Sequence, residues 1–403
     1  MDAIAVAQKM SKVELLERIK NSEIHDYASR ITLNEAILRA GNESSALGAP
    51  VSLVIALDNS DVSGCLLEIL RIEREKFFIG MEIAVLCITD SANYTIRKTL
   101  YIPEYAADFA QSLEEDALRH SFNIELGIVD MRSAKGALVI HPATLVMLAD
   151  YFEGKALGYR YVSVNNRPLQ RVEGEAKIAT LLDAKNTKAL EIGCEFYPQT
   201  AASLSINELD IVNGVIRVLT EKECIITETA KILASAQSQH CGKCVFCREG
   251  LIQLTSIHKD IMAGKGKMEY LDLIKEIGRA MSAGSFCSLG QRSPLIALSA
   301  IEHFMDEYEA HIKKRNCFAG VCISFVAIYI DPDICTGCTE CLDICPVDCI
   351  EGRRGYIHMI DEKDCTRCGK CIEACPENAV NQTSSKPPKL PDRPTKCGKF
   401  RNR

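Results

Sequence analysis

Two stretches of sequence, CTGCTECLDICP at 335–346 and CTRCGKCIEACP at 365–376, decide the fold of the C-terminal region. Each reads CxxCxxCxxxCP, a run in which three thiolates bind one [4Fe-4S] cluster and the fourth binds a neighbouring cluster. Zinc is the alternative for CxxC pairs, but zinc does not require the doubled CxxxCP. The spacing predicts two clusters. The ligands are Cys335, Cys338, Cys341 and Cys375 for the first, and Cys365, Cys368, Cys371 and Cys345 for the second.

The doubled run is that of a two-cluster bacterial ferredoxin, so we expect an α+β ferredoxin domain over 331–382. Two clusters this close together serve to pass single electrons, and a purely structural role is the alternative. The residues that follow, 383–403, are Pro-rich and basic, which favours an extended tail.

Composition sets limits on the class of protein. The 403 residues are 47% hydrophobic and 25% charged, which is typical of a globular chain of two or three domains. The net charge of −7 argues against a nucleic-acid binder. No apolar run approaches the roughly 20 residues of a membrane span, and the charged N-terminus lacks an apolar signal core. We therefore expect a cytoplasmic protein without membrane insertion, and its 20 cysteines indicate metal ligation instead of disulfides.

A third cysteine group lies at 240–250, HCGKCVFCREG, in which three thiols stand three residues apart. The search for a fourth ligand leads to GSFCSLG, where Cys287 follows Cys247 by 40 residues. This arrangement resembles the C-terminal cluster domain of the NADH-oxidising flavoprotein subunit of respiratory complex I and of its relatives in soluble hydrogenases and formate dehydrogenases. The resemblance implies one [4Fe-4S] cluster, and a four-cysteine zinc site is the alternative. The implied ligands are Cys241, Cys244, Cys247 and Cys287.

The resemblance extends beyond the cysteines. Residues 158–200 look like the family's ubiquitin-like insert, NGVIRVLTEKECIITETAKILA like its approach to the cluster helix, and AIEHFMDEYEAHI like its closing helix. Appended C-terminal clusters are typical of the hydrogenase-type relatives, in particular the NADH-receiving subunit of electron-bifurcating hydrogenases. The resemblance is strong after residue 230 and faint before residue 130.

The family's flavin motifs are missing. The family cradles FMN and NADH with a loop of the form GRGGxGFPxGxKW, whose bare backbone approaches the phosphate closely. The nearest glycines here, Gly41 and Gly48, are seven residues apart with bulky and acidic residues between them. The second flavin segment, GAGxYxCGEETAL, corresponds to ELGIVDMRSAKGALVIHPATLVML, which lacks its acidic pair. We therefore expect no FMN and no NADH oxidation; a divergent flavin site is the alternative.

Patterning divides the chain into six parts. The stretches 51–58, 82–89 and 124–131 are predicted strands separated by amphipathic helices, as in an α/β domain. Short β segments then suggest a β-grasp-like insert, and helical periodicity from 228 to 315 indicates an all-α bundle. The expected parts are a degenerate flavin-domain-like scaffold (1–157), the insert and connector (158–227), the cluster-binding bundle (228–315), a hinge (316–330), the ferredoxin (331–382) and the tail (383–403).

A fourth metal is suggested by HIKKRNCFAGVC, which places His311, Cys317 and Cys322 between bundle and ferredoxin. The hydrogenase-type relatives carry a similar CxxGVC, which looks like part of a zinc hinge. Zinc takes four tetrahedral ligands, so one more is needed, and Cys397 and Cys349 are candidates. The alternative is two ordinary cysteines and a surface histidine. The isolated cysteines Cys65, Cys87, Cys194 and Cys224 are expected to be small core residues, and His240 either hydrogen-bonds the bundle cluster or is solvated.

These features favour an iron–sulfur electron-transfer subunit that relays single electrons between partner subunits and its ferredoxin arm. The expected partners are other subunits of a flavoprotein, hydrogenase or dehydrogenase complex. Two alternatives remain: a catalytic NADH dehydrogenase with a divergent FMN site, and a structural adaptor.

Overall fold

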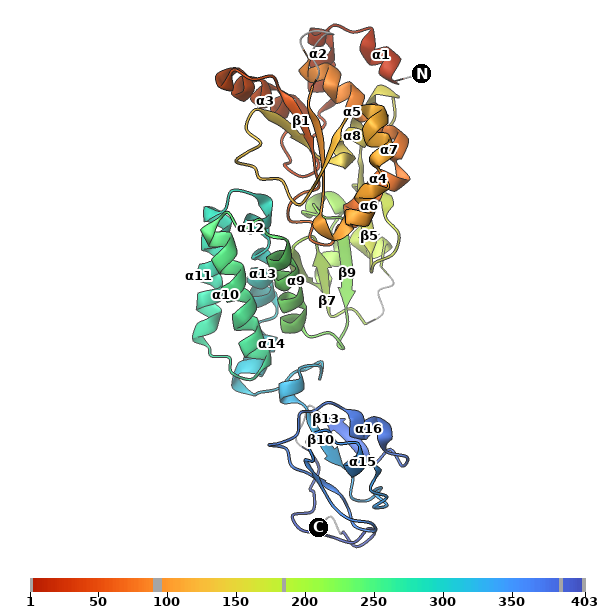
Figure 1. Cartoon of the computed structure of the whole chain (residues 1–403), viewed down its shortest axis with the longest axis vertical. Helices are drawn as coiled ribbons and strands as arrows, with labels where there is room; N and C mark the ends of the chain where they lie inside the picture. Colours follow the sequence, from red (N-terminus) through yellow and green to blue (C-terminus); the bar gives the residue numbers. More distant parts are fainter. Residues whose placement is uncertain (1–2, 90–95, 183–185, 384–386, 401–403) are drawn as a thin grey trace. The chain divides into compact units, whose positions relative to one another are not determined.

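The structure is a computed structural model that describes residues 3–89, 96–182, 186–383 and 387–400 (Figure 1). These residues form two compact units. The first comprises the chain up to Thr220 together with Thr229–Ser256 and Leu271–His303. The second comprises Glu221–Glu228, Ile257–Tyr270 and the chain from Phe304 onward.

The N-terminal part of the first unit is built on a parallel sheet with strand order β3-β2-β1-β4. The strands are β1 Ser52–Ile55, β2 Lys98–Ile102, β3 Asn123–Leu126 and β4 Ala137–Ile140. Eight helices or helical turns accompany them: α1 Ala3–Gln8, α2 Lys12–Ser22, α3 Leu33–Leu47, α4 Ile69–Ile72, α5 Arg74–Ile88, α6 Ala107–Gln111, α7 Glu114–His120 and α8 Pro142–Phe152. Parallel strands with crossover helices confirm the predicted α/β class.

The predicted strand at 82–89 is wrong, because most of that stretch lies in helix α5. The helix is apolar on nearly all sides, so its sequence has no helical periodicity, and a buried helix of this kind cannot be told from a buried strand by periodicity. Helix α5 packs against α8. The contact is close at Gly80, where a Cβ would collide with the backbone of Leu145.

The insert is a five-stranded mixed sheet of order β6-β5-β9-β7-β8 with its own apolar core. Its strands are β5 Tyr159–Val164, β6 Gln170–Glu173, β7 Ala189–Ile192, β8 Glu195–Pro198 and β9 Val215–Leu219. Strands β5 and β9 run parallel and the other pairs are antiparallel. The short β segments expected from the sequence in this region are present as strands.

The helical region follows the predicted periodicity. Its helices are α9 Ile225–Gln239, α10 Val245–Met262, α11 Glu269–Gly284, α12 Ser288–Arg292, α13 Leu295–His303 and α14 Met305–Lys313. Helix α10 begins directly after Cys244 and carries Cys247 in its first turn, and α12 begins directly after Cys287. The cysteines therefore lie at helix starts, where backbone N–H groups are unpaired and favour negative charge.

The C-terminal part has the two-fold repeated layout of a ferredoxin. Strand β10 Ala327–Ile330 pairs with β13 Val380–Thr383, and β11 Ile350–Glu351 pairs with β12 Met359–Ile360. Helices α15 Glu340–Asp343 and α16 Lys370–Ala374 each lie within one cysteine run.

Part of the expected extended tail (383–403) lies against the ferredoxin, and its residues 384–386 and 401–403 fall outside the described residues. Ile357 donates its N–H to the Thr395 carbonyl at 2.9 Å, and Cys397 donates to the Gly355 carbonyl at 3.1 Å. Phe400 packs on the ferredoxin core. Backbone pairing and apolar burial outweigh the proline content of the segment, so residues 395–400 cover one side of the ferredoxin.

Candidate metal centres

The first ferredoxin cysteine set lines a single cavity. Cys335, Cys338, Cys341 and Cys375 surround a space of about 280 Å³ together with His358. Burial and the three neighbouring thiols raise the pKa of Cys341 to about 12, which shows that four like groups converge there. The four thiols of this cavity are those that the crossed pairing predicts for one cluster.

The first cavity also holds His358, which the sequence analysis did not single out, and it lies beside Cys397, which was a zinc candidate. Nδ1 of His358 lies 3.2 Å from the Cys341 sulfur, and His358 is 2% exposed. Its buried Nε2 has no hydrogen-bond partner among the described residues. Cys397, brought in by the tail, lies beside Cys335. A buried imidazole facing a thiol fits a site that holds thiolate-bound iron.

The second ferredoxin set lines its own cavity of about 300 Å³. Its predicted ligands, Cys345, Cys365, Cys368 and Cys371, are joined there by a fifth thiol, Cys349. The Cys349 sulfur lies 3.6 Å from the Cys345 sulfur. Burial and the neighbouring thiols raise the pKa of Cys371. Cys349 therefore belongs to this cavity and not to the hinge.

The bundle cysteines also converge. Burial, with Cys287, Cys244 and Cys241 nearby, raises the pKa of Cys247 to about 12. The absence of a side chain at Gly290 leaves room beside the bundle cysteines. A Cβ there would lie 3.0 Å from the Cys247 Cβ and would collide with Ser285. The buried Ser285 hydroxyl has no hydrogen-bond partner in the described parts of the chain. Four converging thiols beside an unpartnered hydroxyl fit a metal-bound group better than a packed core.

A loop of the N-terminal domain reaches the bundle cysteines. Nη2 of Arg132 lies 3.7 Å from the Cys244 sulfur, and Nζ of Lys243 lies 2.6 Å from a carboxylate oxygen of Asp130. No signal in the sequence pointed to these contacts, because more than 100 residues separate the partners. His240, which the sequence analysis considered for this site, has a buried Nδ1 without a partner among the described residues.

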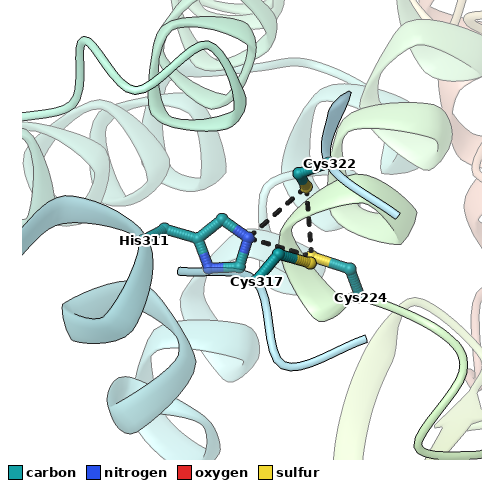
Figure 2. A group of neighbouring side chains, drawn as sticks. All are labelled: Cys224, His311, Cys317 and Cys322. Carbon is teal, nitrogen blue, oxygen red and sulfur yellow. Dashed lines mark hydrogen bonds between the residues drawn. The ribbon is translucent and has the colours of Figure 1, made fainter. Parts of the chain in front are cut away.

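The hinge residues form a tight group with a fourth member, Cys224. The potential ligand atoms of Cys224, His311, Cys317 and Cys322 all lie within 4.8 Å of one another, and all four residues are buried (Figure 2). Cys224 is buried, as expected of a small core residue, but its sulfur also lies in this group, whereas Cys397 and Cys349 are not part of it. Cys224 directly precedes α9, so the helix start turns its sulfur toward His311.

The distances in this group fit a tetrahedral zinc ion. The sulfurs of Cys224 and Cys322 are 3.8 Å apart, and Nε2 of His311 lies 3.3 Å and 3.4 Å from them. A tetrahedron with Zn–S near 2.3 Å and Zn–N near 2.0–2.1 Å has S–S edges of about 3.8 Å and S–N edges of about 3.6 Å. Cys224, Cys322 and His311 are thus placed as three corners of such a site, and the Cys317 sulfur lies within 4.8 Å of all three ligand atoms.

Surrounding contacts fix the orientation of the ligands. Nδ1 of His311 lies 2.8 Å from the Glu307 carbonyl, which leaves Nε2 free to face the sulfurs. The Thr227 hydroxyl lies 3.4 Å from the Cys322 sulfur. Burial lowers the pKa of His311, but hydrogen bonds with Cys224 and Cys317 outweigh it and raise the pKa to about 10. The neighbouring sulfurs thus favour a positive charge at this position, which a bound cation would supply in place of the proton.

Comparison with known proteins identifies two iron–sulfur modules in the chain. Residues 227–311 match the NADH-ubiquinone oxidoreductase-F iron-sulfur binding region, and residues 327–376 match a 4Fe-4S dicluster domain. The chain carries both of these iron–sulfur modules. The first spans the bundle cysteines and the second spans both cysteine runs of the ferredoxin.

Curated relatives are similar over these modules. The NADP-reducing hydrogenase subunit HndC of Solidesulfovibrio fructosivorans is 35% identical over 171 residues, which are 42% of this chain and 34% of the relative. A subunit of the NADH-quinone oxidoreductase of Rhizobium meliloti is 30% identical over 128 residues, 32% of this chain and 29% of the relative. The chain thus matches only about a third of the length of these two relatives.

The fold is similar to that of solved hydrogenase chains. Crystal structures of NAD⁺-reducing [NiFe]-hydrogenase match with TM-scores of 0.58 (H2-reduced state) and 0.60 (air-oxidized state). Each match has 15% identity and covers 75% of this chain and 63% of the other. At this identity the likeness concerns the fold alone. None of the helices in the described ranges combines the length and the apolar character that crossing a membrane requires.

Proposed function

We propose that this chain is an iron–sulfur electron-transfer subunit of a multi-subunit oxidoreductase, and that it has no flavin site of its own. The observation that carries the proposal is the convergence of twelve cysteines into three groups of four. Each group would hold a [4Fe-4S] cluster, which takes up and releases single electrons without bond formation to a substrate. The protein supplies the thiolates, the burial and the hydrogen bonds that set each potential.

The residues after β1 support the absence of a flavin. In an open parallel sheet, nucleotides bind beyond the carboxyl ends of the strands. Here that position is lined by Asp58, Asn59 and Asp61, with Tyr101 from β2, around a space of about 280 Å³. Burial raises the pKa of Asp61 to about 6, so it remains largely ionised at neutral pH. Carboxylates in place of glycine N–H groups repel a flavin phosphate.

The loop after β3 supports the same conclusion. It corresponds to the family's second flavin segment, but its side chains are already engaged. Asp130 accepts hydrogen bonds from the Arg132 N–H at 3.1 Å and from the Ser133 hydroxyl at 2.8 Å, and it pairs with Lys243. Because the loop is bonded to itself and to the cysteine segment, it leaves no free acidic pair for a flavin.

A catalytic NADH dehydrogenase with a divergent FMN site is the second candidate. One observation favours it: the fold resembles that of an NAD⁺-reducing hydrogenase chain, with a pocket at the carboxyl edge of the parallel sheet. The glycine-poor, acidic lining of that pocket weighs against it.

The hinge group is proposed to hold a structural zinc ion through Cys224, His311, Cys317 and Cys322. Four ligands without an open position are typical of structural sites and not of catalytic ones. A bound ion would link the start of α9 to the end of α14 and to the segment that leads into the ferredoxin. It would stabilise this arrangement only in the folded chain.

The test of the proposal is cofactor analysis of the purified full chain. We expect about twelve iron atoms per chain, four for each of three clusters, and no flavin released on heat denaturation. Stoichiometric FMN together with NADH-dependent dye reduction would establish the second candidate instead. If no partner reductase can reduce the clusters, the remaining function is that of a structural adaptor.

A further inference from the structure

The bundle cysteines have a neighbour that no part of the proposed function uses. The loop between β3 and β4 belongs to the N-terminal domain, yet three of its contacts fall on the two segments that carry these cysteines. The strands and helices on either side of these contacts all belong to the first compact unit.

The loop is held in one shape by its own hydrogen bonds. Asp130 accepts from the Arg132 N–H at 3.1 Å and from the Ser133 hydroxyl at 2.8 Å, and its carbonyl accepts from the Ser133 N–H at 2.9 Å. These hydrogen bonds fix the backbone of the loop, and therefore the position from which the Arg132 side chain extends.

An ion pair ties the loop to the first cysteine segment. Nζ of Lys243, which lies between Cys241 and Cys244, is 2.6 Å from the Asp130 carboxylate. This hydrogen bond holds the pKa of Asp130 at about 2, so the Asp130 carboxylate is charged at neutral pH.

Arg132 touches both cysteine segments. Its Nη2 lies 3.7 Å from the Cys244 sulfur, and its guanidinium carbon lies 4.8 Å from the centre of the Phe286 ring. Phe286 directly precedes Cys287. A guanidinium held by an aromatic face and by a carboxylate 3.8 Å from its Nε has a fixed direction.

We propose that Arg132 raises the reduction potential of the cluster held by Cys241, Cys244, Cys247 and Cys287, through an N–H donated to the Cys244 thiolate. The proposal rests on the proposed function, since it requires that cluster. Reduction adds one electron and no proton, so the cluster becomes more negative by one charge. A permanent cation that donates to a ligand sulfur stabilises the more negative state. The potential therefore rises, and the cluster becomes the better electron acceptor.

The experiment is an anaerobic dithionite titration of the full chain, followed by EPR, for the wild type and Arg132→Gln. We expect the potential of the bundle cluster to fall in the variant, by about a tenfold change in its reduction equilibrium constant, which is about 59 mV for a one-electron couple. A larger effect is not expected, because Arg132 is 41% exposed. The ferredoxin clusters serve as an internal reference whose potentials should not move.

Two further variants distinguish the effect of the Arg132 hydrogen bond on the potential from the effects of a lost positive charge and of misfolding. Arg97→Gln removes a cation from the same domain, one that pairs with Glu125 and contacts no described cysteine, and should leave the potential unchanged. Arg132→Lys keeps the charge but loses the planar fork, so a smaller fall is expected. Equal potentials in Arg132→Gln and Arg97→Gln would overturn the proposal.

If Arg132→Gln fails to retain the cluster, Arg132→Lys decides the outcome. A wild-type potential in Arg132→Lys, or loss of the cluster from both variants, would overturn the potential-setting role. A wild type with only about eight iron atoms and no bundle signal would contradict the proposed function itself, and this result is distinct from an unchanged potential.

Discussion

The Cys224 sulfur lies 3.3 Å from Nε2 of His311, although 87 residues separate the two in the sequence. This contact brings the start of α9 to the end of α14 and completes a group of four buried N and S atoms (Figure 2). Three of the four were candidates from the sequence. The fourth, Cys224, brings the number of potential zinc ligands in this group to four.

Replacing Cys224 by serine should remove zinc and leave iron in place. Structural zinc sites use four ligands, so loss of one buried thiolate should lower the zinc content from about one ion per chain to near zero. The three cluster groups do not include Cys224, so iron should stay at about twelve atoms. Elemental analysis of protein purified without chelators measures both metals. Cys65→Ser, at an isolated cysteine, is the matched control. Wild-type protein without zinc would end the hinge proposal.

Two glycines of the ferredoxin offer a matched pair of substitutions. Gly337 and Gly369 both have positive φ, 72° and 78°. A Cβ at Gly337 would lie 2.7 Å from the Gly355 nitrogen, whereas nothing lies within 4 Å of a Cβ at Gly369. Arg367, which stands in the second run where Gly337 stands in the first, has φ 57°, so positive φ alone is tolerated at this position of the run.

Gly337→Ala should therefore prevent assembly of the first ferredoxin cluster, while Gly369→Ala should cost only the roughly 1–2 kcal/mol of a left-handed alanine. Iron should fall from about twelve to about eight atoms in the first variant and stay near twelve in the second. Equal iron contents in the two variants would show that backbone crowding at Gly337 does not decide assembly.

His358 should make the two ferredoxin clusters unequal. Its buried Nδ1 lies 3.2 Å from the Cys341 sulfur, and in the tautomer that carries its proton there it donates to a thiolate. A hydrogen bond to a charged group contributes about 1.5 kcal/mol or more, which corresponds to roughly 60 mV for a one-electron couple. His358→Leu should lower the potential of the cluster held by Cys341, and His358→Gln, which retains a donor, should lower it less. EPR-monitored titration measures both; unchanged potentials in His358→Leu would refute the assignment.

The sequence predicted those features that local spacing determines. Each of these features depends on residues that lie close together in the sequence. They are the doubled CxxxCP run, the CGKCxxC segment and the helices of the bundle. Cys224 could not be paired with His311 in this way, since only tertiary packing joins them. Its place directly before a helix, within the stretch that resembles the family's approach to the cluster helix, was the one available signal. Helix α5 was missed because a helix buried on all sides loses its periodicity.

Other contacts were missed for the same physical reason. The proline and basic content of the tail does not indicate that Thr395 and Cys397 pair with the ferredoxin backbone. His358 and Arg132 belong to no sequence motif. Only the folded chain shows that each lies close to a cysteine sulfur.

The most direct test of a flavin-free electron-transfer role is a spin count by EPR on the anaerobic full chain, first with NADH alone and then with dithionite. We predict no reduced clusters with NADH, because a chain without a flavin cannot split a hydride into single electrons. We predict about three unpaired spins per chain with dithionite, one for each of three reduced clusters. Reduction by NADH alone would show that the chain has its own flavin site. About two spins, unchanged by Cys287→Ser, would show that the bundle holds no cluster.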